Sequence, residues 1–490
     1  MKITSRMASK LFRTKSLQEM MDNASDSEHS LKRALSATSL VFIGIGAIVG
    51  TGIFVITGTA AAQYAGPALS ISFVISALLC MFVALCYSEF ASMIPVSGSA
   101  YSYAYTTVGE AIAWFIGWNL VLEYIFGASL VAVGWSGYVV SFFKDFGIMI
   151  PPALSSAPFT YENGWIATGA ILNFPAVFIV ALITTILVFG IKESVRVNNI
   201  IVIIKVAVIL LFIGFGLSYI DKGNYIPFIP ENTGEFGKYG WSGIFRAAGI
   251  IFLAYLGFDA ISTVAQETKN PQKDLAIGIL GSLAIVTVLY ISVSLVLTGI
   301  VNYKLLNVPD PIAVGINAAG TKLFWLRPII KIGAIAGMSS VILVLATGMP
   351  RILYTISLDG LLPPVLSKVH KKYRTPHITT ILVGAVISVI AGLFPIDLIA
   401  DMVSIGTLAA FAMVCISIII LRIKRPDIPR PFKTPVVYFV GSVGALGCFY
   451  LMTSLPASTW ERLLIWTIIG FLIYFIYGMK HSKLNNLTNK

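Results

Sequence analysis

Long apolar segments alternate with short polar stretches along most of this chain, and the alternation predicts a bundle of membrane-spanning helices. The segments are 17 to 33 residues long. An α-helix needs about 20 residues to cross a bilayer, and the segments are too long for strands of a membrane barrel. We expect twelve spans, and an even number places both termini on the same side of the membrane. The expected spans lie at 41–62, 68–94, 110–142, 172–190, 197–219, 243–267, 275–301, 328–357, 377–394, 399–421, 435–455 and 462–478.

The first span carries four glycines and a single hydroxyl group near its middle. Residues 41–56 read VFIGIGAIVGTGIFVI, and Thr51 stands between Gly50 and Gly52. Glycine inside a helix costs about 1 kcal/mol relative to alanine. The pattern therefore favours a helix that breaks at membrane depth and offers bare backbone groups to a ligand. Close packing of a small-residue face against another helix is the alternative interpretation.

The sixth span has a similar interruption. Residues 249–267 read GIIFLAYLGFDAISTVAQE, with Gly249 and Gly257 on either side of Leu253–Leu256. Interrupted spans at positions 1 and 6 occupy matching places in two five-helix halves, which predicts inverted repeats with a site between them. A half-helix that begins near Gly50 favours an anion through its free N–H groups. A half-helix that ends near Leu256 favours a cation through its free carbonyls. The two ends together predict a site for a zwitterionic α-amino acid.

Lys205 is the ionisable residue that stands deepest in an apolar span, within IIVIIKVAVILLFI. A lone lysine in mid-membrane costs several kcal/mol unless it is paired or deprotonated, so we expect a proton carrier. Its ammonium could equally bridge backbone carbonyls and hydroxyls where other transporters hold Na⁺, and Ser339 and Ser340 of the eighth span are candidate partners. The alternative is a side chain that reaches back to the membrane surface.

Five further residues in the spans have chemistry that needs an explanation. Glu123 lies deep in an apolar span and could pair with a cation, bind a proton or hydrogen-bond broken backbone. We expect Asp259 to cap the half-helix that follows the second break, and Met338 to form an adaptable pocket wall. Lys331 and Arg246 stand near the outer ends of their spans and are expected to reach the membrane surface.

Composition and charge exclude several other classes of protein. The chain is 57% hydrophobic and 11% charged, whereas soluble chains carry about 25% charged residues. The net charge of +12 does not indicate a nucleic-acid partner, because most lysines and arginines fall on one side of the predicted topology. That asymmetry predicts that both termini lie in the cytoplasm. The expected location is the plasma (inner) membrane, as a multi-pass protein. The four cysteines and four histidines form no metal or cofactor pattern, and we expect no enzyme activity.

The domain organisation follows from the same segments. We expect 1–40 to be a mostly disordered cytoplasmic tail and 479–490 to be a second cytoplasmic tail. Between them, 41–421 would form a ten-helix transport core, with repeats at 41–219 and 243–421, and 435–478 would form two accessory helices.

The motifs GIGAIVGTGIF and FLAYLGFDAISTVAQETKNPQKD, together with Lys205, resemble the amino acid–polyamine–organocation superfamily. Within it, the chain is similar to bacterial members of the cationic amino acid transporter family, over nearly its whole length. The resemblance implies a leucine-transporter-type fold, with a 5+5 inverted repeat, discontinuous helices 1 and 6 and two further helices. The lysine in the fifth span is typical of proton-coupled members.

The resemblance also implies roles for individual residues. The substrate carboxylate would meet the backbone of Gly50, Thr51 and Gly52 beside Ile48, and the amine would meet the carbonyls of Leu253, Ala254 and Leu256. Lys205 would take the place of sodium and couple protons. Phe258 would act as an aromatic gate, and Glu123 and Met338 would line the pocket.

These expectations combine into import of amino acids by proton symport through alternating access. Met338 is bulky and Glu123 is the one nearby acid, so we expect small or medium neutral amino acids such as alanine, with arginine or lysine second. The expected partners are the amino acid, protons and the lipid bilayer, and a small membrane accessory subunit is left open. Two alternatives remain: an amino acid/amine exchanger, and a membrane amino-acid receptor that does not transport.

Overall fold

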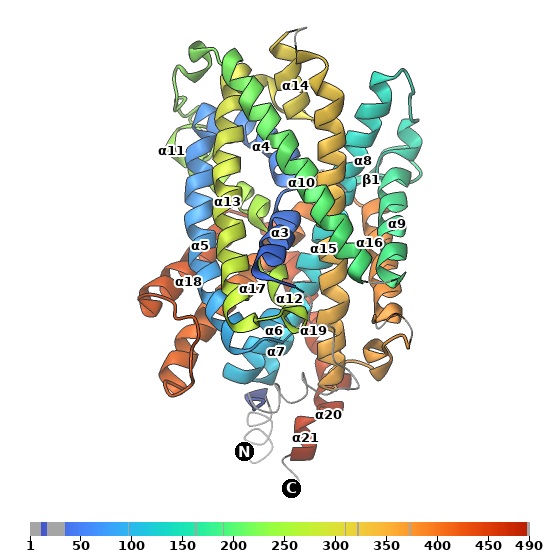
Figure 1. The fold of residues 1–490 in the computed structure, drawn as a ribbon, viewed down its shortest axis with the longest axis vertical. Helices are drawn as coiled ribbons and strands as arrows, with labels where there is room; N and C mark the ends of the chain where they lie inside the picture. The colour runs from blue at the N-terminus through green and yellow to red at the C-terminus, as the bar shows by residue number, and fades with distance from the viewer. Residues whose placement is uncertain are drawn as a thin grey trace.

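A computed structural model describes residues 11–16, 35–96, 98–161, 164–189, 191–308, 310–320, 323–371, 373 and 375–487. Within these residues the protein is a helical bundle whose long helices lie side by side (Figure 1). Eight helical stretches are long and apolar enough to cross a membrane: Gly52–Met93, Glu110–Asp145, Asn198–Tyr219, Gly240–Thr263, Pro271–Ile300, Leu326–Leu358, Ile396–Lys424 and Ala457–His481. Four shorter apolar helices accompany them: Ala37–Ile48, Phe174–Phe189, His377–Leu393 and Val437–Thr453.

The first helix, α3, spans Ala37–Ile48 and begins before the expected 41. The Ser36 hydroxyl caps it by accepting the Ser39 N–H. After Ile48 the chain turns extended at Val49, with φ −75° and ψ 99°. Helical structure resumes in a π-helical turn at Gly52–Ile56 and continues through α4 (Thr57–Ala60). The glycine-rich segment is therefore interrupted at Val49 and Gly50, and Thr51 is already helical, with φ −54° and ψ −31°.

The sixth predicted span is interrupted as well. Helix α11 (Gly240–Ile251) tightens into a 3₁₀ turn at Phe252–Tyr255, and Leu256 is extended with ψ 147°. Gly257 then adopts φ +104° before the short helix α12 (Ala260–Thr263). A Cβ at Gly257 would lie 2.8 Å from the Cβ of Ala47, so both the backbone angle and the contact with α3 require glycine there.

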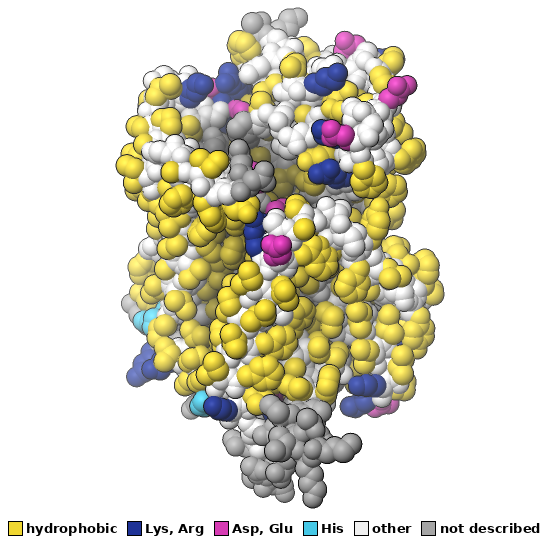
Figure 2. Space-filling view, turned by 180° about the vertical axis from the view of Figure 1, so that it is seen from behind, with side chains coloured by type: hydrophobic (Ala, Val, Ile, Leu, Met, Phe, Trp, Pro, Cys, Tyr) yellow, Lys and Arg dark blue, Asp and Glu magenta, His cyan; other side chains and the backbone are white. Residues whose placement is uncertain are grey.

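Two groups of helices surround these breaks. Helix α13 (Pro271–Ile300) packs against α3 and against α5 (Leu69–Met93). Helix α15 (Leu326–Leu358) packs against α8 (Gly127–Asp145) and α10 (Ile191–Gly216). Figure 2 shows hydrophobic side chains over most of the face it presents, with most of the charged side chains toward the two ends of the bundle and a few near its middle. That distribution suits a protein surrounded by lipid.

The remaining elements complete the bundle and its two ends. They are α6 (Ser99–Thr107), α7 (Glu110–Val121), the strands β1 (Phe159–Tyr161) and β2 (Trp165–Ala167), α9 (Phe174–Phe189), α14 (Pro311–Ala318), α16 (His377–Leu393), α17 (Ile396–Lys424), α18 (Val437–Thr453), α19 (Ala457–Ile473), α20 (Met479–His481) and α21 (Leu484–Leu487). The strands pair antiparallel, with Thr160 opposite Ile166.

Both ends of the described chain lie at one end of the bundle, which we call the terminal face. Residues 11–16 are hydrogen-bonded there to the turn between α6 and α7, so the disorder expected for the N-terminal tail does not extend to them. The rest of that tail, 1–10 and 17–34, lies outside the described residues.

Candidate functional site

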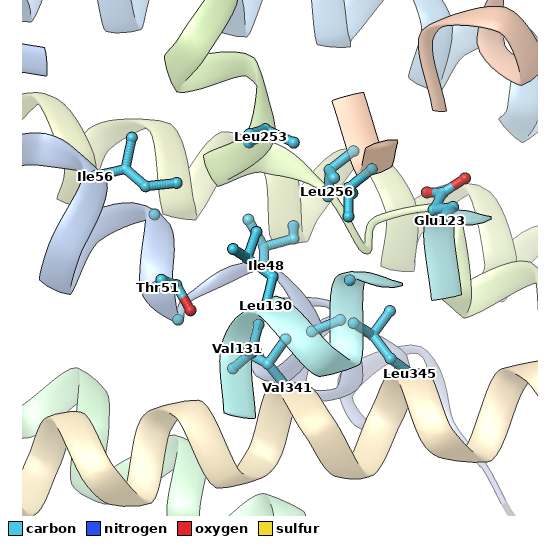
Figure 3. A pocket seen from close by; sticks show the side chains of 15 residues that line it. Ile48, Thr51, Ile56, Glu123, Leu130, Val131, Leu253, Leu256, Val341 and Leu345 are labelled. Carbon is cyan, nitrogen blue, oxygen red and sulfur yellow. The ribbon is translucent and has the colours of Figure 1, made fainter. Parts of the chain in front are cut away.

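A cavity lies between the two helix breaks, and Figure 3 shows its lining side chains. About 450 Å³ of space is free of protein atoms there, including space open to solvent. Aliphatic side chains make up most of its wall. Its lining residues are Ala47, Ile48, Gly50, Thr51, Gly52, Ile56, Glu123, Gly127, Leu130, Val131, Leu253, Leu256, Val341, Leu345 and Val403.

Glycine lets the two broken helices touch beside this cavity. A Cβ added at Gly52 would lie 2.3 Å from the Cβ and 2.4 Å from the Cα of Ala254. A Cβ added at Gly50 would lie 2.6 Å from a methyl group of Val341. Any larger residue at either place would push the segments apart. The glycines therefore serve the close packing of the alternative interpretation as well as the break itself.

The two breaks present opposite partial charges. At the first break, the N–H groups of Ile53 and Phe54 donate to the Gly50 carbonyl at 3.2 Å each, so the N–H groups of Thr51 and Gly52 precede the first hydrogen bond of the resumed helix. The segment that ends at Tyr255 brings its last carbonyls to the second break. Two of these carbonyls already have a donor: the Leu256 N–H lies 3.3 Å from the Leu253 oxygen, and the Tyr290 hydroxyl lies 3.0 Å from the Ala254 oxygen. The same hydroxyl lies 2.9 Å from the Ile48 oxygen, so Tyr290 connects the two breaks.

Sequence reasoning missed Tyr290. It belongs to an apolar run of the seventh expected span and carries no charge, so its one signal is a lone phenol hydroxyl in a buried segment, which needs a partner. In the structure its side chain on α13 is fully buried.

Lys205 lies behind the first break and does not line the cavity. Its ammonium donates to the carbonyls of Gly46 and Val49 at 2.9 Å each and to the Ser340 hydroxyl at 3.0 Å. Three acceptors satisfy all three N–H groups of the buried ammonium. The predicted bridging of carbonyls and a hydroxyl is therefore present, and the side chain does not reach the membrane surface.

Ser339 is not a partner of Lys205, contrary to the expectation. Its hydroxyl accepts the Trp135 indole N–H at 2.9 Å and donates to the Ile335 carbonyl at 2.8 Å. Adjacent helical residues point about 100° apart, so Ser339 and Ser340 cannot both face the same neighbour.

Glu123 reaches the cavity from the middle of the Glu110–Asp145 helical stretch, where one π-helical turn spans Leu122–Phe126. Its carboxylate is buried, and neither oxygen has a hydrogen-bond partner among the described residues. The Thr51 hydroxyl, at the first break, is also buried and also has no hydrogen-bond partner among the described residues. Unsatisfied buried groups that face a cavity are suited to a ligand with complementary donors.

Asp259 does not cap α12 with its side chain, so that prediction is wrong. One carboxylate oxygen instead accepts the Tyr124 hydroxyl at 2.7 Å. A phenol from a neighbouring helix supplies a donor that the local capping rule does not consider.

The candidate residues divide into two groups. Seven line the cavity: Ile48, Gly50, Thr51, Gly52, Glu123, Leu253 and Leu256. Four do not: Lys205, Ala254, Phe258 and Met338.

Phe258 and Met338 were expected at the pocket, as a gate and as a wall, but they pack elsewhere. Phe258 is fully buried and packs edge-on or tilted against Tyr87 and Phe411, at ring distances of 5.9 Å and 5.2 Å. The Met338 sulfur lies against Gly134 of α8, where an added Cβ would approach it to 3.5 Å. In this conformation, neither residue forms part of the cavity wall.

Similarity to known proteins identifies the family of this chain. The family model described as amino acid permease matches residues 35–474. This chain belongs to that family. A branched-chain amino acid permease of Bacillus subtilis (strain 168) is 46% identical over 480 residues, which cover 98% of this permease and 100% of the relative. A methylthioribose transporter of the same strain is 46% identical over 477 residues, covering 97% and 100%. A vacuolar cationic amino acid transporter 4 of Arabidopsis thaliana is 34% identical over 419 residues, covering 85% and 68%.

These findings confirm the resemblance to bacterial members of the amino acid–polyamine–organocation superfamily. The permease is a multi-pass membrane protein of an amino acid transport family.

Ion pairs lie toward both ends of the bundle in this permease. Toward the end opposite the terminal face, the Lys331 ammonium is fully buried and lies 2.6 Å from Asp145 and 3.6 Å from Asp310. The expectation that Lys331 reaches the membrane surface is therefore wrong. Arg246 is exposed, and its guanidinium lies 4.9 Å from the centre of the Tyr64 ring.

On the other side of the cavity, Arg351 of α15 pairs with Glu267 at 2.5 Å. Glu267 follows α12, and both side chains are only 5% exposed. This pair fastens the second broken segment to α15.

Proposed function

We propose that this permease imports neutral amino acids, branched-chain ones above all, by proton symport across the plasma membrane. The observation that carries the proposal is the cavity between the two helix breaks, with opposite partial charges at its ends and aliphatic side chains around it. A zwitterion with an apolar side chain complements all three features.

The substrate carboxylate would bind the free N–H groups at Gly50, Thr51 and Gly52, next to Ile48. The ammonium would bind the carbonyls at Leu253, Ala254 and Leu256. Two of these carbonyls already accept hydrogen bonds, Leu253 from the Leu256 N–H and Ala254 from Tyr290. A carbonyl has two lone pairs, so each can accept the ammonium as well.

Among the small or medium neutral amino acids that the sequence favours, the cavity wall supports one with a branched aliphatic side chain over alanine. Ile56, Leu130, Val131, Val341 and Leu345 face the space beside the breaks (Figure 3). Burying such a side chain contributes about 1.5–3 kcal/mol. The name of one bacterial relative, a branched-chain amino acid permease, agrees with this choice.

Lys205 would carry the coupled proton. Its ammonium holds Gly46 and Val49 on the two sides of the point where α3 ends. Loss of the proton removes a charge-assisted hydrogen bond from that backbone and would loosen the first break. Proton binding and the shape of the substrate site would thus be linked.

Transport would follow from alternating access in a twelve-span, 5+5 inverted-repeat core at 41–421, with accessory helices at 435–478. The bundle of spans 1, 2, 6 and 7 would rock against the other core helices, with the terminal face in the cytoplasm. Phe258 would shift to gate the site, and Met338 would come closer to it, as the bundle moves. The ligand would drive this motion through its different affinity for the two states.

A second candidate substrate is methylthioribose, after the other bacterial relative. The unpartnered oxygens of Glu123 and Thr51 favour it, because they could accept hydrogen bonds from sugar hydroxyls. An amino acid exchanger is a third possibility for the same cavity.

The deciding experiment is uptake into proteoliposomes, with a panel of radiolabelled leucine, isoleucine, valine, alanine, arginine and methylthioribose. We expect accumulation of the branched-chain amino acids when the pH gradient is directed inward, and only equilibration without it. Counterflow that is indifferent to the gradient would indicate exchange. Accumulation of methylthioribose alone would favour the second candidate, and binding without any uptake would favour a receptor.

A further inference from the structure

Residues 11–16, which we call the N-terminal strap, are held to the terminal face by their backbone. The Lys15 N–H donates to the Tyr105 carbonyl at 3.0 Å, and the Glu110 N–H donates to the Arg13 carbonyl at 2.9 Å. Tyr105 and Glu110 stand on either side of the turn between α6 and α7. Two main-chain hydrogen bonds fix the register of the strap on this turn.

Two ion pairs reinforce the backbone contacts. The Lys15 ammonium lies 2.6 Å from Asp359, and the Arg13 guanidinium lies 3.4 Å from Glu110. The Asp359 and Glu110 side chains are only 4% and 0% exposed. Buried carboxylates are costly unless a counter-charge accompanies them, and here the strap supplies it.

The C-terminal end of the chain meets the same two acids. The Ser482 hydroxyl donates to Glu110 at 2.5 Å, and the Lys483 N–H donates to the Asp359 carbonyl at 3.1 Å. Arg13 joins the two chain ends directly, because its guanidinium donates to the Asn485 side chain at 3.0 Å.

The surface beneath the strap is shaped to receive it. Gly109 has φ +134°, and an added Cβ would lie 2.7 Å from the Cα of Phe12. Gly360 makes the corresponding close approach to the C-terminal segment: it has φ +83°, and an added Cβ would lie 2.3 Å from the His481 carbonyl oxygen. Neither close approach leaves room for a side chain.

The strap is connected to the second broken segment through α6. The Tyr101 hydroxyl of α6 donates to Asp359 at 2.9 Å, so α6 and the strap share this carboxylate. Two residues earlier, at its first residue, α6 contacts α12, where the Ser99 and Ser262 hydroxyls are 2.8 Å apart. If α12 moves outward from the terminal face, it must therefore move past α6. The strap holds α6 in place.

We propose that the terminal face is a docking surface for the chain's own N-terminal strap, and that the docked strap keeps this side of the permease closed. The inference rests on the alternating access of the proposed function. Release of the strap would free α6 and raise the population of the state that is open to the cytoplasm.

The test is the accessibility of a cysteine placed at the contact between α12 and α6, in a Ser262→Cys background. The four native cysteines are buried, so background labelling by a membrane-impermeant maleimide is low. In inside-out vesicles, Lys15→Ala should raise the labelling rate at least about tenfold, because breaking a buried ion pair destabilises the state that contains it. The conservative variant Lys15→Arg, which keeps the cation beside Asp359 and leaves the Tyr101 acceptor in place, should keep the slow rate.

The matched control is Lys273→Ala, which removes an exposed lysine from the start of α13 and should leave the rate unchanged. Unchanged labelling in both Lys15→Ala and a variant without residues 1–16 would overturn the proposal. Docking itself is read by hydrogen exchange, since the Glu110 amide should lose its protection when residues 1–16 are removed. An amide that exchanges equally fast with and without them would also contradict it.

These readouts do not depend on transport. A permease that labels as expected but accumulates no amino acid would refute the proposed function and leave the docked strap standing. A permease that accumulates amino acids but whose labelling does not change would refute the docked strap and leave the proposed function standing.

Discussion

Lys205 is the residue whose removal tests proton coupling. Lys205→Ala deletes the ammonium that donates to Gly46, Val49 and Ser340, so the first break loses its charge-assisted hydrogen bonds. We expect accumulation driven by a pH gradient to fall to the level measured without a gradient. Uptake of radiolabelled isoleucine into proteoliposomes is the measurement, with Lys273→Ala as the control. Normal gradient-driven accumulation in Lys205→Ala would rule out this role.

Tyr290 is the residue whose hydroxyl joins the two breaks. Tyr290→Phe leaves the carbonyls of Ile48 and Ala254 without their donor, which should cost about 1–3 kcal/mol of stability in the empty protein. A bound ammonium supplies a new donor to Ala254, so substrate should stabilise this variant more than it stabilises the wild type.

Thermal unfolding with and without substrate measures both effects of Tyr290→Phe. Tyr255→Phe is the matched control, because its hydroxyl bonds the Phe73 carbonyl away from the first break. Equal substrate stabilisation in Tyr290→Phe and wild type would show that the ammonium does not bind near Ala254.

At the scale of elements, the contact of the two broken helices depends on Gly52. Gly52→Ala places a Cβ 2.3 Å from the Cβ of Ala254, so the two segments must separate. We expect substrate affinity and uptake to fall by at least about tenfold, since such overpacking typically costs about 1–3 kcal/mol. Gly137→Ala on α8 is the control, because an added Cβ there meets nothing within 4 Å. Uptake by Gly52→Ala at the rate of Gly137→Ala would contradict this account.

The elements also show how far the sequence could be interpreted. Both helix breaks follow from glycines within a single span, because a break is a local property of the chain. The partners of Asp259 and Lys331 could not be predicted in this way. Tyr124 and Asp145, which bind them, are far away in sequence and are brought close only by the packing of helices. The predicted helix cap at Asp259 and the predicted surface position of Lys331 were both wrong because a side chain distant in sequence supplied a better partner.

At the scale of the whole molecule, charge predicts the orientation in the membrane. The basic stretches 368–376 and 422–433 follow the ends of α15 and α17 on the side of the terminal face. Positive charge near span ends favours the cytoplasm. The hairpin of β1 and β2 follows Asp145, at the far end of a 36-residue helical stretch that begins at Glu110 on the terminal face. That stretch is about 54 Å long at 1.5 Å per residue, enough to cross a bilayer.

This geometry predicts that the hairpin faces the outside of the cell and both termini face the inside. Gly164→Cys in the hairpin, where an added Cβ meets nothing within 4 Å, should react with a membrane-impermeant maleimide in intact cells. Tags on both termini should bind antibody only after the membrane is permeabilised. The native cysteines are buried, so the unmodified permease provides the labelling control. Tags that react in intact cells would invert the topology, and the strap would then control the outer side of the transport cycle.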